Sequence, residues 1–320
     1  MFPQLLIPAN TLRFYLTVAV TLACGVGVSA CTTTHKPPRP EQLANLSYQG
    51  IYDTPVTLSD GVYEGAPFVP GGASRPRVEL IEHSFVTGNL GGDGAAEAVV
   101  LLSASTGGSG TQIYLAVTAR GNDQLRNIAT QRIGDRVQIR ALRIEQQAIV
   151  LELIVAGPTD GACCPRQKLR NSYRLEGGQL VQAASVQLGT LGIADLNGAG
   201  KVMQLDRNDA VPDDVTVSVT FSDGKISGAA GCNRYFGAVK GKDPYDLSVG
   251  PVGATRMACP EPVMAIEDRF LRALEGVRQF GFLMGKVALT WEVGQVMGTM
   301  LLAPASDSAQ KDKKKPPGGG

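Results

Sequence analysis

The segment from Phe221 to Cys259 constrains the fold of this chain more than any other. Its sequence is FSDGKISGAAGCNRYFGAVKGKDPYDLSVGPVGATRMAC, with two cysteines and seven glycines. Val215–Phe221 alternates apolar and hydroxyl residues, a period of two that predicts a strand with one buried face. The Asp-Gly pair at Asp223 predicts a type I′ hairpin turn, because both central residues of that turn need positive φ. The small residues 225–231 that follow predict a returning strand that bends where another backbone passes closely.

A helix is predicted directly after this segment. Pro260 suits its first turn, and Gly276 is well placed to end it. Apolar residues at helical spacing predict one buried face: Val263, Ile266, Phe270 and Leu274. The other faces are expected to carry Glu267, Asp268 and Arg272. Two β-rich runs, 287–291 and 296–302, predict a closing hairpin, so we expect an antiparallel sheet with one packed helix.

Three stretches of this region resemble a known family. They are SGAAGCNRYFG at Ser227–Gly237, ATRMAC at Ala254–Cys259, and the helical run 267–274. They resemble the META domain, also called the HslJ-like domain, and we place it at 201–303 after a linker at 189–200. The resemblance implies a small α+β domain found in bacterial envelope proteins and linked to stress or antibiotic tolerance. It implies no established enzymatic activity.

Four residues of this region are candidates for binding a ligand or an anion. Asn233, Arg234 and Tyr235 belong to the signature of the family, and Arg256 lies in its second motif. Either arginine could bind an anion. The glycines around the signature and the neighbouring Cys232 favour a role in shaping the fold. Both interpretations stay open.

Residues 46–188 are predicted to form a separate antiparallel all-β domain of uncharacterised type. A length of 320 residues suits two domains. Seven β-rich runs separated by turn residues predict a sandwich or curled sheet without a helix: 78–86, 97–102, 112–119, 137–144, 148–155, 169–175 and 180–188. The expected fold is therefore an all-β domain followed by an α+β domain.

Residues 1–30 are predicted to be a lipoprotein signal peptide. Arg13 is their one charged side chain, and the apolar run 14–28 is shorter than the ~20 residues that span a bilayer. Small residues before Cys31 resemble the lipobox of bacterial lipoproteins. This implies a mature chain that begins with a lipidated Cys31 carrying palmitate-type acyl chains, and Thr32 after it favours the outer membrane. The alternatives are an ordinary signal peptide or an uncleaved anchor.

The interpretation of two further regions follows from this predicted localisation. Residues 31–45 are predicted to be a Pro-rich tether and residues 304–320 a disordered tail. We expect the folded part at the periplasmic face of the outer membrane, held there by the lipid.

Four cysteines remain in the predicted mature chain: Cys163, Cys164, Cys232 and Cys259. An even number in an exported chain favours disulfides, and the simplest pairing is one bridge in each domain. Bridges between the domains stay open. A functional alternative makes Cys163 and Cys164 a thiol-redox or soft-metal site, although adjacent cysteines lack the two-residue spacer of thioredoxin-like and zinc-binding pairs.

The loop 88–97 resembles the Asp-rich calcium loops that precede strands in integrin-type repeats. Calcium binds roughly six to eight oxygen ligands. Asn89, Asp93 and Glu97 could offer oxygens, whereas Gly91 has no side-chain ligand. The alternative is an ordinary turn that retains its glycines, and residues 195–200 resemble such a loop more faintly.

The sequence contains no recognisable catalytic motif, and its two histidines are His35 and His83. Lys and Arg total 30 and Asp and Glu total 29, so no basic field for nucleic acid is expected.

We therefore expect a non-catalytic envelope lipoprotein, a binding or interaction module that supports envelope integrity or stress tolerance. Its partners would be the membrane, through the lipid, and an envelope protein or a wall component. Calcium is the one cofactor considered. The alternatives are a thiol-redox or metal-handling protein that uses the vicinal cysteines, and a calcium-stabilised structural module.

Overall fold

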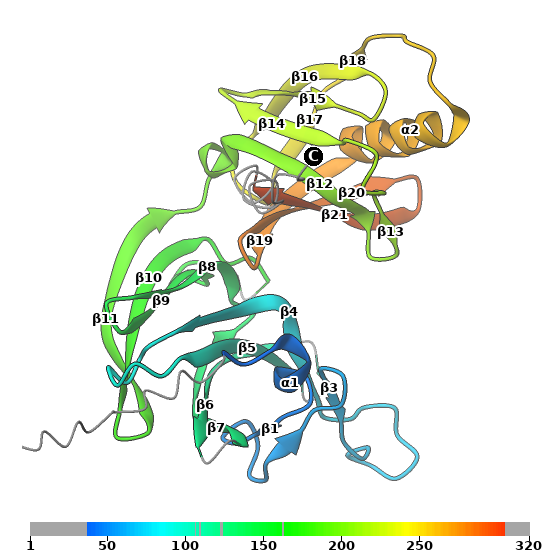
Figure 1. Ribbon diagram of the computed structural model, residues 1–320. Coiled ribbons are helices and arrows are strands. Elements are labelled where there is room, and N and C mark those ends of the chain that lie inside the picture. The colour runs from blue at the N-terminus through cyan, green and yellow to red at the C-terminus, as the bar shows by residue number, and fades with distance from the viewer. Residues whose placement is uncertain (1–36, 106, 109, 122–123, 162, 305–320) are drawn as a thin grey trace, which may run out of the picture. The chain divides into compact units, whose positions relative to one another are not determined.

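The computed structural model describes residues 37–304 apart from 106, 109, 122–123 and 162 (Figure 1). The predicted signal peptide, the predicted lipidation site Cys31 and the residues of the predicted tail from 305 onward lie outside the described residues. Antiparallel strands dominate the described chain, and its longest helix lies near the C-terminus. This confirms the predicted fold class of an all-β region followed by an α+β region.

The first domain contains a five-stranded and a four-stranded antiparallel sheet. The first sheet has the order β3-β4-β5-β6-β7, with bounds Val62–Glu64, Arg77–Gly88, Glu97–Ser105, Gln112–Gly121 and Gln124–Asp135. The second has the order β11-β10-β9-β8, with bounds Gln179–Thr190, Gln167–Glu176, Ala148–Val155 and Gln138–Glu145. A small sheet pairs β1 with β2, Ser47–Tyr48 and Val56–Thr57. Six of the seven predicted runs fall within strands, and the seventh, 137–144, begins one residue before β8.

One core is shared by the two larger sheets. Leu101 and Leu115 of the first sheet belong to the same buried cluster as Ile149 and Leu151 of the second. Burial of each such side chain contributes about 1.5–3 kcal/mol. The sheets therefore pack face to face.

Strand β5 is covered on both faces, which explains its continuous apolar sequence. Val99 and Leu101 lie in the core between the sheets, whereas Val100 and Leu102 lie in a second cluster on the opposite face. That second cluster includes Leu43, at the end of helix α1 (Pro40–Leu43). Within the predicted tether, residues 40–43 thus form a helix whose last side chain is buried.

Strand β7 was not predicted, for a physical reason. It forms the edge of its sheet, and Ala129 is its one buried residue. A strand exposed on most of its length carries little apolar alternation, so its sequence gives a weak signal.

The second domain is built on one curled antiparallel sheet with the order β17-β16-β15-β14-β12-β21-β20-β19. β13 pairs with β12 and β18 with β16. In chain order β12 to β21 span Gly198–Asp206, Asp209–Ala210, Ser218–Ser222, Lys225–Ala229, Arg234–Gly241, Leu247–Val249, Gly253–Ala254, Val277–Leu283, Lys286–Val293 and Val296–Pro304. The two ends of the sheet meet, because Phe280 N of β19 donates to Pro244 O before β17 at 2.9 Å.

Helix α2, Glu261–Glu275, packs against this sheet (Figure 1). Pro260 precedes it and Gly276 ends it, as predicted. Ile266, Phe270 and Leu274 are buried in the core of the domain. The predicted hairpin turn is also confirmed, because Asp223 and Gly224 have φ of 48° and 73°.

The linker between the domains is short and ordered. β11 ends at Thr190, the 3-10 helix η1 spans Ile193–Leu196, and β12 begins at Gly198. Most of the predicted linker 189–200 therefore belongs to regular structure.

Candidate functional site

Asn233 belongs to a buried polar cluster beside the disulfide bond between Cys232 and Cys259, whose Cα atoms lie 6.0 Å apart. The Asn233 Oδ1 accepts from Met257 N and from Thr255 Oγ1, each at 2.7 Å. Its Nδ2 donates to Met257 O at 3.1 Å. These bonds fasten the start of β16 to the segment before α2.

Glu267 completes this cluster from the helix. Its Oε2 accepts from Asn233 N at 2.7 Å and its Oε1 from Asn233 Nδ2 at 2.8 Å. We had expected Glu267 on an outer face of the helix, but it is 5% exposed. The expectation was wrong because a buried carboxylate is tolerated where N–H donors satisfy its oxygens.

Tyr235 also points into the domain. Its hydroxyl donates to Ser218 O at 2.9 Å, and its ring meets Phe270 edge to face with centroids 5.3 Å apart. Burial raises the pKa of the Tyr235 phenol far above its ordinary value. Two of the four predicted binding residues, Asn233 and Tyr235, are thus buried.

The two arginines of the predicted set lie at the surface. The backbone of Arg234 forms two hydrogen bonds with Thr255. Thr255 N donates to Arg234 O at 2.9 Å, and Arg234 N donates to Thr255 Oγ1 at 3.1 Å. Arg256 follows Thr255 in the chain and is exposed. Neither guanidinium makes a hydrogen bond or ion pair with any residue in the described part of the chain.

Phe236 stands on the same outer face as Arg234, two residues further along β16. Its side chain is 68% exposed. Its ring lies over Gly253 of the neighbouring strand β18, so close that a Cβ on Gly253 would approach the ring to 2.8 Å. Glycine at that position leaves room for the ring.

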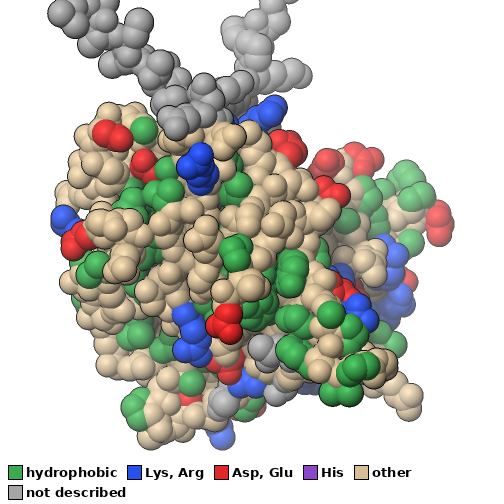
Figure 2. All heavy atoms as spheres, turned by 90° about the horizontal axis from the view of Figure 1, so that it is seen from below, with side chains coloured by type: hydrophobic (Ala, Val, Ile, Leu, Met, Phe, Trp, Pro, Cys, Tyr) green, Lys and Arg blue, Asp and Glu red, His purple; other side chains and the backbone are tan. Residues whose placement is uncertain are grey.

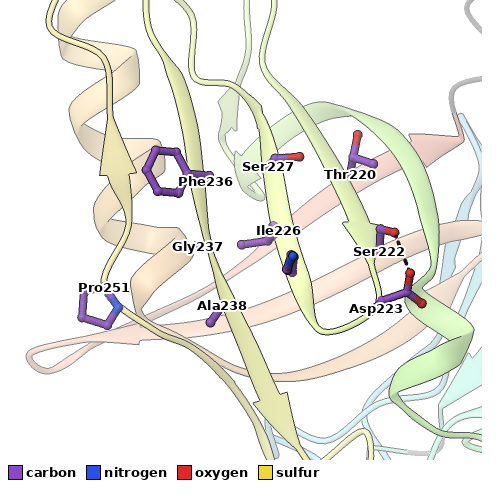
Figure 3. Close-up of a pocket in the computed structure, with 10 residues that line it drawn as sticks. Thr220, Ser222, Asp223, Ile226, Ser227, Phe236, Gly237, Ala238 and Pro251 are labelled. Carbon is purple, nitrogen blue, oxygen red and sulfur yellow. Dashed lines mark hydrogen bonds between the residues drawn. The ribbon is translucent and has the colours of Figure 1, made fainter.

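Hydroxyl groups continue this outer face across the sheet. Thr220 of β14 pairs with Ser227 of β15, and Ser227 pairs with Phe236 of β16 (Figure 3). Beside this row the face is hollowed by a shallow pocket of ≈ 650 Å³. The pocket is lined by Thr220, Ser222, Asp223, Lys225, Ile226, Ser227, Phe236, Gly237, Ala238 and Pro251. We call this surface, together with Arg234 and Arg256, the outer face.

In the first domain, the predicted calcium ligands serve as acceptors for the backbone of their own loop. Asn89 Oδ1 accepts from Gly92 N at 2.6 Å, Asp93 Oδ1 from Ala95 N at 2.9 Å, and Glu97 Oε2 from Leu90 N at 2.7 Å. Calcium binding here stays a prediction. A rise in Tm with calcium that Asp93→Ala abolishes would establish it.

Cys163 and Cys164 are bonded to each other in the loop between β9 and β10. Asp160 organises this loop, since its Oδ2 accepts from Gly157 N and Arg166 N at 3.0 and 2.9 Å. These N–H groups, together with the Arg166 guanidinium, hold the pKa of the Asp160 carboxyl below its ordinary value. No group of three or more His, Cys, Asp or Glu side chains that could hold a metal occurs among the residues that the structure describes.

Asp195 fastens the linker to the first domain. Its carboxylate accepts from Lys168 Nζ at 2.8 and 2.9 Å, from Gly192 N at 3.0 Å and from Arg140 Nη1 at 3.1 Å. The residue that suggested a faint calcium loop therefore serves as an ion-pair partner of two basic side chains.

Figure 2 shows one face of the molecule, on which Lys and Arg side chains are mixed with Asp and Glu side chains. Within residues 37–304, where the structure is described, no helix is long and apolar enough to cross a membrane.

The family comparison matches the second domain. Residues 195–303 match the model of the META domain family. Residues 195–303 form a META domain. The match begins six residues before the predicted start at 201, so the META domain includes the end of η1 and the whole of β12.

Other comparisons add little to this assignment. An NMR structure of a protein from Burkholderia xenovorans is similar at 24% sequence identity, covering 35% of this chain and 86% of that chain, with a TM-score of 0.28. No curated protein matches the chain.

Sequence reasoning about the META domain missed Phe236 and the hydroxyl row. Phe236 lay inside the quoted signature but was not singled out. The available signal was the alternation of β16, in which Tyr235 and Val239 are buried while Arg234 and Phe236 are exposed. Only the strand's register shows which set faces solvent.

Proposed function

We propose that this protein is a lipid-anchored envelope protein that acts by binding a partner, not by catalysis, and so supports envelope integrity or stress tolerance. In this proposal the lipid is carried by Cys31, and the partner is a wall component or an envelope protein. The META domain supports it, because this domain points to an envelope- or stress-related family. The observation that carries the proposal is Phe236, exposed beside Arg234 on the outer face.

The fold of the META domain gains little from Phe236. The ring is two-thirds exposed, whereas the core is built from the inward residues of the same strand, such as Tyr235 and Val239. Covering the ring with a partner would contribute up to about 1.5–3 kcal/mol. An exposed aromatic ring is therefore a natural anchor for a partner.

The exposed arginines suit the same role. A guanidinium is planar, always charged and more weakly hydrated than an ammonium, so it pairs readily with anionic groups at an interface. Arg234 and Arg256 hold no partner among the described residues, and pairing with a ligand would break no ion pair of the fold.

A sedimentation experiment tests the proposal. The full chain is purified as the Cys31→Ala variant, which cannot receive a lipid, and mixed with envelope fragments from cells that lack the protein. We expect the chain to sediment with the fragments. Phe236→Ala and Arg234→Gln, each added to it, should weaken the apparent affinity about tenfold, since a lost anchor of 1.4 kcal/mol changes Kd tenfold.

Two matched substitutions serve as controls. Met297→Ala removes an apolar side chain that is 64% exposed at the hairpin of β20 and β21, and Arg174→Gln removes an exposed arginine of β10. Both should leave sedimentation unchanged. Equal binding by the Phe236→Ala variant and its parent would refute the outer face as the binding surface.

A further inference from the structure

We infer that the partner of the outer face is a glycan whose sugars carry carboxylates. This inference rests on the proposed function and names the chemical class of its ligand. Three features of the outer face support it: an aromatic ring, a row of hydroxyl groups and cations that have no partner within the described chain.

The ring and the hydroxyls lie in one row across three strands. Thr220, Ser227 and Phe236 are successive partners in register on β14, β15 and β16 (Figure 3). Neighbouring strands lie about 4.8 Å apart, so the row extends over roughly 10 Å. A ligand that lies along the row would meet the hydroxyls at one end and the ring at the other.

These groups match the two kinds of surface that a sugar offers. A pyranose ring has an apolar C–H face, which can cover an exposed aromatic ring such as that of Phe236. Its hydroxyl groups both donate and accept hydrogen bonds, and so do the side chains of Thr220 and Ser227. The pocket beside the row is also lined by Ser222, whose hydroxyl donates to Asp223 Oδ2 at 3.2 Å.

The positive charges of the outer face indicate that the glycan is acidic. Lys225 of β15 and the two arginines of the outer face form no ion pair with any described residue. Asp223 is the one acidic residue among those that line the pocket. Two guanidinium groups suit carboxylates, which they can bind through two parallel hydrogen bonds.

Other polymers fit the outer face less well. An added peptide strand has no free edge here, because β16 is paired with β15 on one side and with β17 and β18 on the other. Nucleic acid would be drawn by a dense positive field, but the chain carries a net charge of +1. A polysaccharide with one carboxylate per sugar matches the moderate number of cations.

The test uses polygalacturonate as the acidic glycan, dextran as a neutral glycan and polyglutamate as an acidic polymer without sugar. Binding of the full-length Cys31→Ala chain is measured by calorimetry at low and moderate salt. We expect binding to polygalacturonate that weakens with salt, because salt screens exposed charges. We expect no binding to dextran, and weaker binding to polyglutamate.

The variants separate the two contributions. Phe236→Ala should weaken polygalacturonate binding about tenfold and leave polyglutamate binding unchanged, because the aromatic contact concerns the sugar alone. Arg234→Gln should weaken both, and the controls Met297→Ala and Arg174→Gln should weaken neither.

Several outcomes would overturn the inference. One is that dextran binds as strongly as polygalacturonate. Another is that polyglutamate binds as strongly as polygalacturonate and the Phe236→Ala substitution weakens neither. The third is that polygalacturonate does not bind. If the envelope fragments still sediment the chain in a Phe236-dependent manner, the proposed function stands and the ligand is of another class. If that dependence is also absent, both are refuted.

Discussion

The backbone N and side-chain Nδ2 of Asn233 donate to the two carboxylate oxygens of Glu267, at 2.7 and 2.8 Å, with both residues almost completely buried. This pair joins β16 to helix α2 beside the disulfide of Cys232. One family signature residue thus serves the fold, while its neighbour Arg234 faces solvent.

Removal of the Glu267 carboxylate should strongly destabilise the META domain. Glu267→Ala leaves two buried N–H donors of Asn233 without acceptors, and we expect a loss of about 3 kcal/mol. Urea denaturation measures it. Asp268→Asn is the matched control, because Asp268 is exposed and its pair with Arg272 is worth little. Equal effects of the two substitutions would contradict the role of Glu267.

Gly228 should tolerate no side chain. It pairs with Tyr235, and a Cβ added to it would overlap the carbonyl oxygen of Ser218. Gly228→Ala must therefore move backbone, and we expect it to cost at least about 2 kcal/mol in urea denaturation. Gly237→Ala is the control, since its Cβ would meet neighbours at ordinary distances of 3.4 Å or more. A small loss of stability in the Gly228→Ala variant would contradict this and would show that β14 and β15 can move apart.

The Cys232–Cys259 bond should stabilise the chain more than the vicinal bond. The two cysteines are 27 residues apart, and closing that loop contributes about 3–4 kcal/mol in the chain-entropy model. Replacing both with alanine should lower the free energy of unfolding by that amount. The double replacement of Cys163 and Cys164 closes no loop of chain and should cost far less.

Alkylation of free thiols decides between a scaffold and the thiol-redox alternative. If the purified chain begins at a lipidated Cys31, as proposed, we expect no label before reduction and four labels after it, counted by intact mass. Two labels before reduction, at Cys163 and Cys164, would favour the redox alternative instead.

Asp195 should make stability depend on acid pH. Burial raises its pKa, but Lys168, the Gly192 N–H and Arg140 outweigh this, so that the pKa lies below its ordinary value. A depressed pKa stabilises the folded state above the unfolded pKa of about 4, and the contribution is lost as pH falls through the folded value. Asp195→Asn should cost about 2 kcal/mol near pH 7, and the difference from the parent should shrink below pH 4.

Urea denaturation at a series of pH values measures this dependence. The control is Asp209→Asn. Asp209 Oδ1 pairs with Arg269 Nη2 at 3.2 Å, and the Arg269 side chain is half exposed. This substitution should have little effect at any pH. A constant difference between the Asp195→Asn variant and its parent from pH 7 to pH 3 would contradict the assignment.

Much of the local structure could be predicted. All seven predicted runs of the first domain are strands, and α2 ends at Gly276 as expected. β7, β17 and β18 were not predicted, because they are short or largely exposed and therefore show little apolar alternation. β16 and β19 were not predicted either, although the burial of their residues alternates. Of the predicted binding residues, Arg234 and Arg256 are exposed, whereas Asn233 and Tyr235 are buried.

What the sequence by itself determined is local. The turn at Asp223–Gly224 and the end of α2 follow from backbone sterics within a few residues, which no distant contact needs to supply. The tertiary structure alone decided that Glu267 is buried and that Phe236 faces solvent. The first depends on Asn233, 34 residues away in the chain, and the second on the register of β15 and β16. A shift of that register by one residue would exchange the two faces of β16, so its inner and outer residues are set by pairing across the sheet.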